Sequence, residues 1–130
     1  MTPFPSTISN AELITFIDGW AALLEVGDYQ AAYQYTAHDP EMQWTPELMR
    51  EIIESYGDAE PGQRVTVVGM PADVQQRKEV DRWPINRSGG VGEIWYDLNI
   101  NGQVSDLTAI FSLEQTANGI TIYLNTIHVM

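Results

Sequence analysis

Two titratable side chains, those of His128 and Tyr96, are the candidates for acid–base chemistry in this sequence of 130 residues. Histidine changes its charge near neutral pH and can act as a general base, and a tyrosine hydroxyl can orient a ligand. Each residue also has a simpler interpretation. A tyrosine on an apolar strand face is usually a core residue with a satisfied hydroxyl, and a histidine near a chain terminus is usually structural or solvated. We therefore retain both as candidates and assign no catalytic residue.

The direction of the His128 side chain depends on the hairpin that precedes it. If Asn118-Gly119 forms a two-residue turn, Ala109 lies opposite His128, and the imidazole points into the core. However, the apolar residues alternate in one phase before position 125 and in the other phase after position 126, which favours a bulge at these two residues. A bulge would turn His128 onto the outer face of the sheet, so both directions remain open.

Two carboxylates, Asp97 and Asp106, are predicted to lie opposite each other. The Asn101-Gly102 dipeptide is a strong signal for a tight hairpin, and a turn centred there pairs 100 with 103 and 97 with 106. Neighbouring carboxylates can share a proton or hold a cation. The simpler interpretation is that each one is solvated or satisfied by an arginine or a turn amide, because no third ligand completes a metal site. We therefore expect no metal and no cofactor.

The residues around this predicted acid pair favour a contact surface. Trp95 and Thr108 flank the pair, and Tyr123 shares its face of the sheet together with two aliphatic residues, Val104 and Ile110. A half-apolar face with central acids is more typical of a partner-binding surface than of a solvated one.

The acidic residues are concentrated in the first half of the chain. The sequence has 18 acidic and six basic side chains and a formal net charge of −12, and Arg50 is the single base before residue 61. In the predicted third helix, acids follow one another at spacings of four, three and four residues, which forms one continuous stripe: Glu47, Glu51, Glu54 and Asp58. Such a face is most often a soluble surface, but it also permits fast, salt-sensitive capture of a basic partner. Nucleic acid is not expected to bind, because phosphates would be repelled.

Composition indicates one globular domain over residues 1–130. The chain has a mass of 14.6 kDa and is 44% hydrophobic, which suits a single core. It has no cysteine, so disulfides, thiolate metal sites and thiol nucleophiles are excluded. No apolar run reaches the length of a membrane span, and no secretory signal is recognisable near Met1. We expect a cytoplasmic protein that does not bind membranes.

Three helices are predicted between about residues 10 and 57. The first begins with a capping box formed by Ser9 and Glu12 and ends at Gly27. A second helix covers 29–35 after Asp28, and a third begins at Thr45-Pro46-Glu47, with proline at its favoured first position, and ends at residue 57.

The second half, about 63–129, has the period of β-strands. Strands are predicted over 64–70, 76–83, 93–100, 104–114 and 120–129, with a loop over 84–92 and a turn at Asn118-Gly119. Helices followed by an antiparallel sheet of about four to five strands indicate the α+β class. One face of this sheet is continuously apolar and should bury the helices: Ile94, Tyr96, Leu98, Ile100, Leu107, Ala109, Phe111, Leu113, Ile120, Ile122 and Leu124.

The helical half resembles the nuclear transport factor 2-like (cystatin-like α+β) superfamily, in uncharacterised bacterial members. Three segments carry the resemblance: Phe16-Ile17-Asp18-Gly19-Trp20, Gly27-Asp28-Tyr29-Gln30-Ala31-Ala32-Tyr33 and Trp44-Thr45-Pro46-Glu47-Leu48. It implies three helices on a curved antiparallel sheet that together enclose a cone. Members include isomerases, dehydratases, cargo binders and immunity proteins, so the fold does not select a function.

Three functional hypotheses follow. The first is a non-catalytic interaction module that binds a protein partner through the acidic stripe, the outer sheet face or both; an immunity protein that masks a basic toxin is one concrete form. The second is an isomerase- or dehydratase-like enzyme or carrier for a small hydrophobic ligand, with His128 as base and a cone lined by Phe16, Trp20, Tyr33, Trp44 and Tyr96. The third is a structural homodimer formed through the outer face of the sheet.

Overall fold

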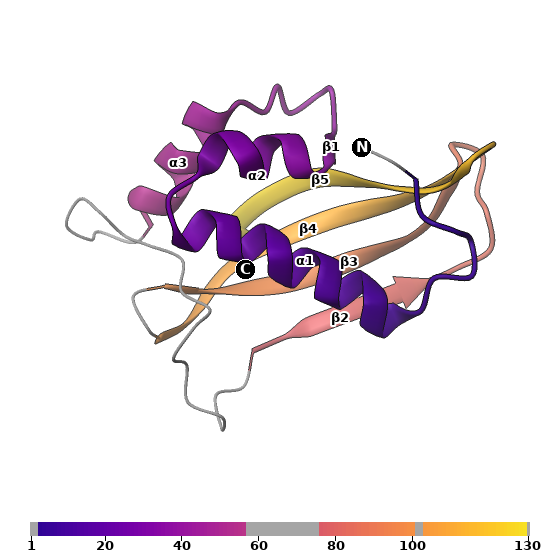
Figure 1. Cartoon of the computed structure of the whole chain (residues 1–130), viewed down its shortest axis with the longest axis horizontal. Helices are drawn as coiled ribbons and strands as arrows, with labels where there is room; N and C mark the ends of the chain where they lie inside the picture. Colours follow the sequence, from indigo (N-terminus) through magenta and orange to yellow (C-terminus); the bar gives the residue numbers. More distant parts are fainter. Residues whose placement is uncertain (1–2, 57–75, 101–102, 130) are drawn as a thin grey trace.

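The computed structural model describes residues 3–56, 76–100 and 103–129, and it combines a layer of helices with one sheet (Figure 1). Helix α1 spans Asn10–Glu25, α2 spans Tyr29–Tyr35 and α3 spans Pro46–Glu54. All three helices lie on one face of the sheet, α1 against β2 and β3 and α3 against β5. This arrangement confirms the predicted α+β class and the predicted order of helices before the main strands.

Each helix begins where a capping side chain satisfies its first amides. The Ser9 hydroxyl accepts a hydrogen bond from Glu12 N at 3.1 Å, and the Glu12 carboxylate accepts one from Ser9 N at 3.3 Å, so the predicted capping box is present. Asp28 and Thr45 cap α2 and α3 in the same way. Because α3 ends at Glu54, it is shorter than predicted, and residue 57 lies outside the described residues.

The sheet contains five strands in the order β1-β5-β4-β3-β2. They are β1 (Ala37–His38), β2 (Lys78–Arg82), β3 (Gly90–Ile100), β4 (Gln103–Thr116) and β5 (Gly119–Val129). The prediction of a purely antiparallel sheet is wrong, because β1 pairs with β5 in parallel and makes the sheet mixed. A two-residue strand has too few positions to show a period, which is why the sequence did not reveal it. The strand predicted over 64–70 lies outside the described residues.

The hairpin between β4 and β5 differs by one residue from the prediction. Thr116 pairs with Gly119, so Ala117 and Asn118 occupy the centre of the turn in place of Asn118 and Gly119. A register shift then follows between the pairs Ile110–Thr126 and Phe111–Leu124, and it leaves Asn125 as an extra residue on β5. The bulge predicted near residues 125 and 126 is therefore confirmed.

The core lies between the helices and the facing side of the sheet. Every apolar residue predicted for that face is buried, and buried helix residues pack against it: Leu13, Ile17, Trp20, Ala21, Leu24, Ala32, Met49 and Ile53. The apolar period of the strands thus predicted the buried face of the sheet correctly.

Candidate functional site

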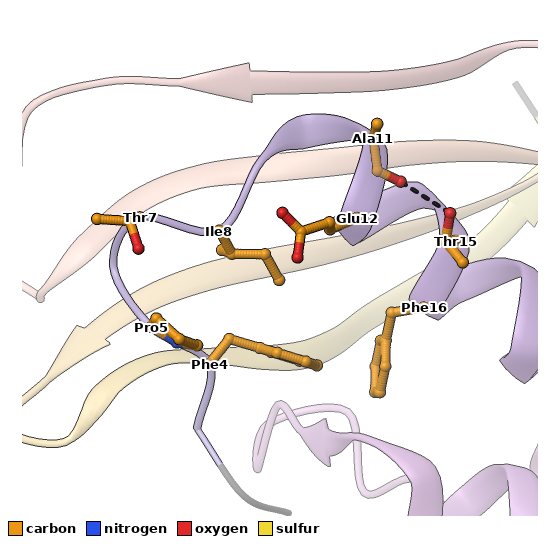
Figure 2. Close-up of a pocket in the computed structure, with 8 residues that line it drawn as sticks. All are labelled: Phe4, Pro5, Thr7, Ile8, Ala11, Glu12, Thr15 and Phe16. Atoms are coloured by element: carbon orange, nitrogen blue, oxygen red, sulfur yellow. Dashed lines mark hydrogen bonds between the residues drawn. The ribbon is translucent and has the colours of Figure 1, made fainter.

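Three of the residues predicted to line a cone between the helices and the sheet are buried in the core. Trp20, Tyr96 and Trp44 are 0%, 1% and 4% exposed and belong to the core, and the Trp20 ring meets the Phe111 ring edge to face at 5.0 Å. A pocket of about 500 Å³ is present elsewhere, between the N-terminal segment and α1 (Figure 2), and Phe16 is the single predicted cone residue in its lining. Of the other predicted cone residues, Trp20, Tyr96 and Trp44 therefore lie in the packed core, and Tyr33 is half-buried.

Tyr96 is held as a hydrogen-bond donor inside the protein. Its hydroxyl donates to Asp18 Oδ1 at 2.6 Å, and Lys78 Nζ binds the same oxygen at 2.9 Å while lying 5.1 Å from the centre of the Tyr96 ring. Burial, followed by the bond to Asp18, raises the pKa of Tyr96 far above its ordinary value, so the hydroxyl keeps its proton. These contacts give Tyr96 the structural role that a core tyrosine normally has.

Asp18 and Lys78 were not singled out from the sequence, although they complete this cluster. Lys78 faces α1 because β2 pairs it with Tyr96. That register depends on the loop between β2 and β3, whose turn geometry could not be predicted from the sequence.

His128 lies on the outer face of the sheet and is exposed. It pairs with Thr108, its Nδ1 is 3.1 Å from the Thr126 hydroxyl, and Ala109 instead faces Ile127. The inward direction considered for His128 is wrong, because the extra residue at Asn125 reverses which side chains point to the core. The carbonyl group of this bulge accepts a hydrogen bond from Trp44 Nε1 at 3.1 Å.

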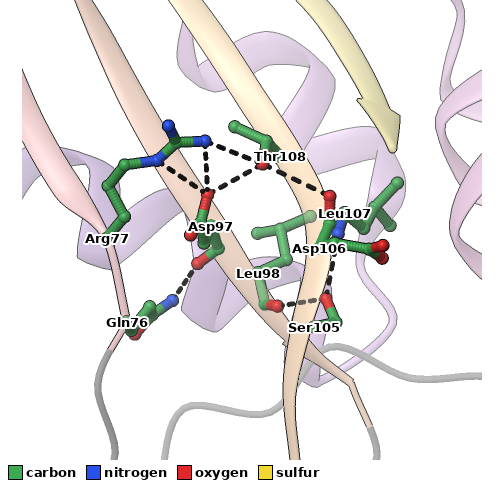
Figure 3. Close-up of polar contacts among 8 residues, drawn as sticks. All are labelled: Gln76, Arg77, Asp97, Leu98, Ser105, Asp106, Leu107 and Thr108. Carbon is green, nitrogen blue, oxygen red and sulfur yellow. Dashed lines mark hydrogen bonds and ion pairs between the residues drawn. The ribbon is translucent and has the colours of Figure 1, made fainter. Parts of the chain in front are cut away.

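Asp97 and Asp106 are not cross-strand neighbours (Figure 3). Asp97 pairs with Thr108, whereas Asn99 pairs with Val104, so three residues of β4 lie opposite the single residue 98. The Ser105 hydroxyl holds this bulge by donating to the carbonyl group of residue 98 at 2.5 Å. A simple count from the 101–102 turn fails because the bulge inserts two residues before Asp97 is reached.

Asp97 is neutralised within the protein. Its Oδ1 accepts hydrogen bonds from Arg77 Nη2 at 3.2 Å and from the Thr108 hydroxyl at 2.7 Å. The Arg77 guanidinium also covers the Trp95 ring at 4.9 Å, and Thr108 is fully buried. Of the residues predicted to form a contact surface on the outer face, Asp97 and Thr108 are therefore hydrogen-bonded to groups of the protein itself. The side chains of Trp95 and Tyr123 are half-buried.

Asp106 is exposed and has a separate partner. Its carboxylate accepts a hydrogen bond from the Tyr56 hydroxyl at 2.5 Å, and this bond raises the pKa of Tyr56. The two acids thus belong to different contacts on the sheet and cannot share a proton.

The acidic stripe of α3 is present over the described part of the third helix. Glu47 and Glu51 are exposed, whereas Glu54 forms an ion pair with Arg50 at 2.6 Å. Asp58 lies outside the described residues. Among the described residues, no basic side chain forms an ion pair with Glu47 or Glu51, which lie one helical turn apart.

Three basic side chains in and next to β2 are directed to intramolecular partners, whereas Arg87 is exposed in the loop between β2 and β3. Arg77 binds Asp97, Lys78 binds Asp18, and Arg82 donates to Asn10 Oδ1 at 3.0 Å and to the carbonyl group of Ile8 at 2.6 Å. The helical surface consequently keeps the negative charge that the sequence gives it.

His38 supplies a pH-dependent contribution to stability. Its ring stacks on Tyr33 at 4.0 Å, and its Nε2 is hydrogen-bonded to the Tyr33 carbonyl group. Burial lowers the pKa of His38 below 6.5 despite this hydrogen bond, which acts in the opposite direction. The folded protein therefore binds the proton less readily than the unfolded chain does.

We expect the free energy of unfolding to decrease as the pH falls from 6.5 through the lower folded-state pKa of His38. Above that window the contribution is complete, because His38 is neutral in both states. Denaturant unfolding at several pH values should show that the wild type loses stability relative to His38→Gln on acidification. Parallel stability curves for the two proteins would contradict this assignment.

Two further structural findings bear on the site. Across residues 3–56, 76–100 and 103–129, no group of three or more histidine and acidic side chains is placed to hold a metal ion. No helix in the described ranges has both the length and the apolar character needed to cross a membrane.

Comparison with known proteins gives one family. A family model described as "Domain of unknown function (DUF7668)" matches residues 21–130 of the chain. No curated protein and no solved structure matches the chain. The residues that line the pocket in Figure 2 all precede the matched range.

Proposed function

Since the chain belongs to the DUF7668 family, a domain of unknown function, we propose its role from its surfaces: it is an interaction module that binds a basic protein partner through the exposed carboxylates of the helical layer. The observation that carries this proposal is that most described basic side chains bind groups of the chain itself, whereas two carboxylates of α3 stay exposed. Arg50, Arg77, Lys78 and Arg82 contact groups of the chain itself and Arg87 is exposed in the loop between β2 and β3, whereas Glu47 and Glu51 stay exposed on α3.

The net negative charge of the protein lets it attract a basic partner before the two surfaces are in contact. With a formal charge of −12, the protein attracts a basic partner during diffusion, and a surface of one sign raises the association rate most at low ionic strength. The outer sheet face supports binding less well, because Arg77 neutralises Asp97 there. We therefore place the partner on the helical side.

The order and packing of the helices and strands support a second proposal, which concerns the fold. We propose that the domain is a variant of the nuclear transport factor 2-like fold, supported by three helices that precede the main strands and cover one face of an open, mixed sheet. An immunity-type protein that masks a basic toxin is the concrete form of such a module that agrees best with the charge.

The test is a charge reversal with a matched control. We expect the double variant Glu47→Lys/Glu51→Lys to weaken binding to the basic partner about tenfold or more, because it replaces attraction by repulsion at the contact. The control, Glu79→Lys/Asp81→Lys, makes the same change in net charge at exposed positions of β2 and should weaken binding much less.

Each protein is used as bait with soluble extract of its source cells at low and high ionic strength. The protein that the wild type retains is then purified and titrated by calorimetry, and circular dichroism confirms that both variants are folded. A partner that is not basic, that ignores ionic strength, or that distinguishes neither variant from the wild type would contradict the proposal.

A further inference from the structure

The pocket beside α1 is open to solvent and is bordered by a segment of chain that is fixed at both ends. The carbonyl group and amide of Phe4 pair with Ile120 through two hydrogen bonds of 2.8 Å. At the other end of the segment, Arg82 Nη2 donates to the Ile8 carbonyl group at 2.6 Å, and Ile8 N closes a turn onto the Pro5 carbonyl group at 3.0 Å. The pocket is therefore formed before a ligand binds, which reduces the entropy lost on binding.

Aromatic and aliphatic side chains make up most of the wall. Phe4 and Ile8 face Phe16 across the space in Figure 2. The Phe16 ring meets the Phe4 ring edge to face at 4.8 Å and stacks on Tyr35 at 4.3 Å, so its position is set from two sides. With a volume of about 500 Å³, the pocket is within the range of small-molecule sites and suits a ligand with an apolar body.

Two of the three polar side chains of the wall, Glu12 and Thr15, act as hydrogen-bond acceptors, whereas the Thr7 hydroxyl can donate or accept. Glu12 is the one ionisable residue of the lining, and its carboxylate points into the loop of the N-terminal segment. Its Oε1 receives only a long bond of 3.3 Å from Ser9 N, and the Thr15 hydroxyl donates its proton to the Ala11 carbonyl group at 3.0 Å. A ligand that satisfies both groups must be a donor, since a carboxylate and a hydroxyl with a committed proton can only accept.

We propose that this pocket binds a small primary amine on an apolar or aromatic body. Its ammonium group donates to the Glu12 carboxylate, and its body packs against Phe4, Ile8 and Phe16. The net charge of −12 favours a cation over a neutral donor. Neither Glu47 nor Glu51 lines the pocket, so reversing their charges tests the partner surface without changing the lining of this site.

Glu12→Gln separates the charge of this side chain from its capping role. Glutamine also completes a capping box, so the variant keeps the bond to Ser9 N and a similar melting temperature. It leaves the partial positive charge at the start of α1 uncompensated, which disfavours an ammonium ion. We expect the affinity for 2-phenylethylamine to fall about fivefold, whereas binding of 2-phenylethanol, a neutral analogue of the same shape, should not change.

Calorimetric titration of the full chain measures both probes. A preference of the wild type for the amine that Glu12→Gln removes supports the proposal. Equal affinity for amine and alcohol, an amine affinity that the variant leaves unchanged, or no binding of either probe would overturn it. Tighter binding of N-acetyl-lysine methylamide than of 2-phenylethylamine would also overturn it, because the site would then take lysine side chains of a protein.

A second pair of variants locates the probe. Ala11 lines the pocket and Ala22 does not, and both are exposed positions of α1. Ala11→Leu should fill the space and abolish binding of both probes, whereas Ala22→Leu should preserve it. If Ala11→Leu bound 2-phenylethylamine as tightly as the wild type, the ligand would lie elsewhere and the proposal would be wrong.

Discussion

Replacing Trp20 by alanine should lower the free energy of unfolding by about 3–5 kcal/mol, because it removes the largest buried side chain and leaves a cavity between α1 and the sheet. Trp20 is completely buried and contacts Phe111 edge to face. Urea unfolding should show a lower midpoint with an unchanged dependence on denaturant, which identifies a loss of stability without a change in the unfolded state.

The indole nitrogen of Trp20 makes the phenylalanine variant informative. Its Nε1 is buried without a hydrogen-bond partner in the described part of the protein. An unsatisfied buried donor costs about 1–3 kcal/mol, and Trp20→Phe removes this cost together with part of the packing. We therefore expect Trp20→Phe to lie within about 1 kcal/mol of the wild type, far from the alanine variant.

Trp83 provides the matched control for this experiment, since it is 38% exposed in the loop between β2 and β3. Trp83→Ala should cost about 1 kcal/mol or less, because the same side chain is removed from a position that packs less tightly. Similar losses for Trp20→Ala and Trp83→Ala, or a phenylalanine variant as unstable as the alanine variant, would contradict the packing assigned to Trp20.

The helices could be predicted from the sequence because their signals are local. A capping side chain and the amide that it binds lie within three residues of each other, as Ser9 and Glu12 do, so no knowledge of the rest of the fold is needed. The buried face of the sheet was equally predictable, because alternation of apolar residues identifies the inner side of a strand wherever its neighbours lie.

The pairing of the strands could not be predicted to the residue. The bulge at 105–107 inserts two residues, which leaves the apolar alternation in phase and gives no signal in the sequence. The bulge at Asn125 inserts one residue and reverses the phase, but the turn residues at 118 and 119 favoured the opposite direction for His128. This is why the predicted Asp97–Asp106 pair was wrong, and why the direction of His128 had two answers. The sequence allowed an arginine as the partner of Asp97, and the structure identifies it as Arg77. The contact between Asp97 and the Thr108 hydroxyl depends on the β3–β4 register and was missed with it.

The pocket was missed for a different reason. Glu12 is readable as a capping residue, but its place in a pocket depends on the N-terminal segment returning to pair with Ile120, more than a hundred residues away in the chain. That long-range contact requires Gly119, whose neighbours the sequence alone cannot show.

Replacing Gly119 by alanine should detach this N-terminal segment and cost about 2–4 kcal/mol of stability. Gly119 has a φ of +133°, and a Cβ atom at this position would lie 2.1 Å from the Phe4 carbonyl oxygen and 3.1 Å from its carbon. Backbone atoms paired with Ile120 cannot move aside without breaking their hydrogen bonds, so the bridge should open and the pocket should lose one wall.

Gly27→Ala separates the steric part of this effect from backbone strain. Gly27 also has a positive φ, +79°, but a Cβ atom there would meet nothing within 4 Å, so its replacement should cost only about 1–2 kcal/mol. Urea unfolding measures both losses, and hydrogen exchange of the Phe4 and Ile120 amides should accelerate in Gly119→Ala alone. If these amides stayed protected and the two variants were equally stable, the N-terminal segment would not depend on Gly119, and the pocket would need another support.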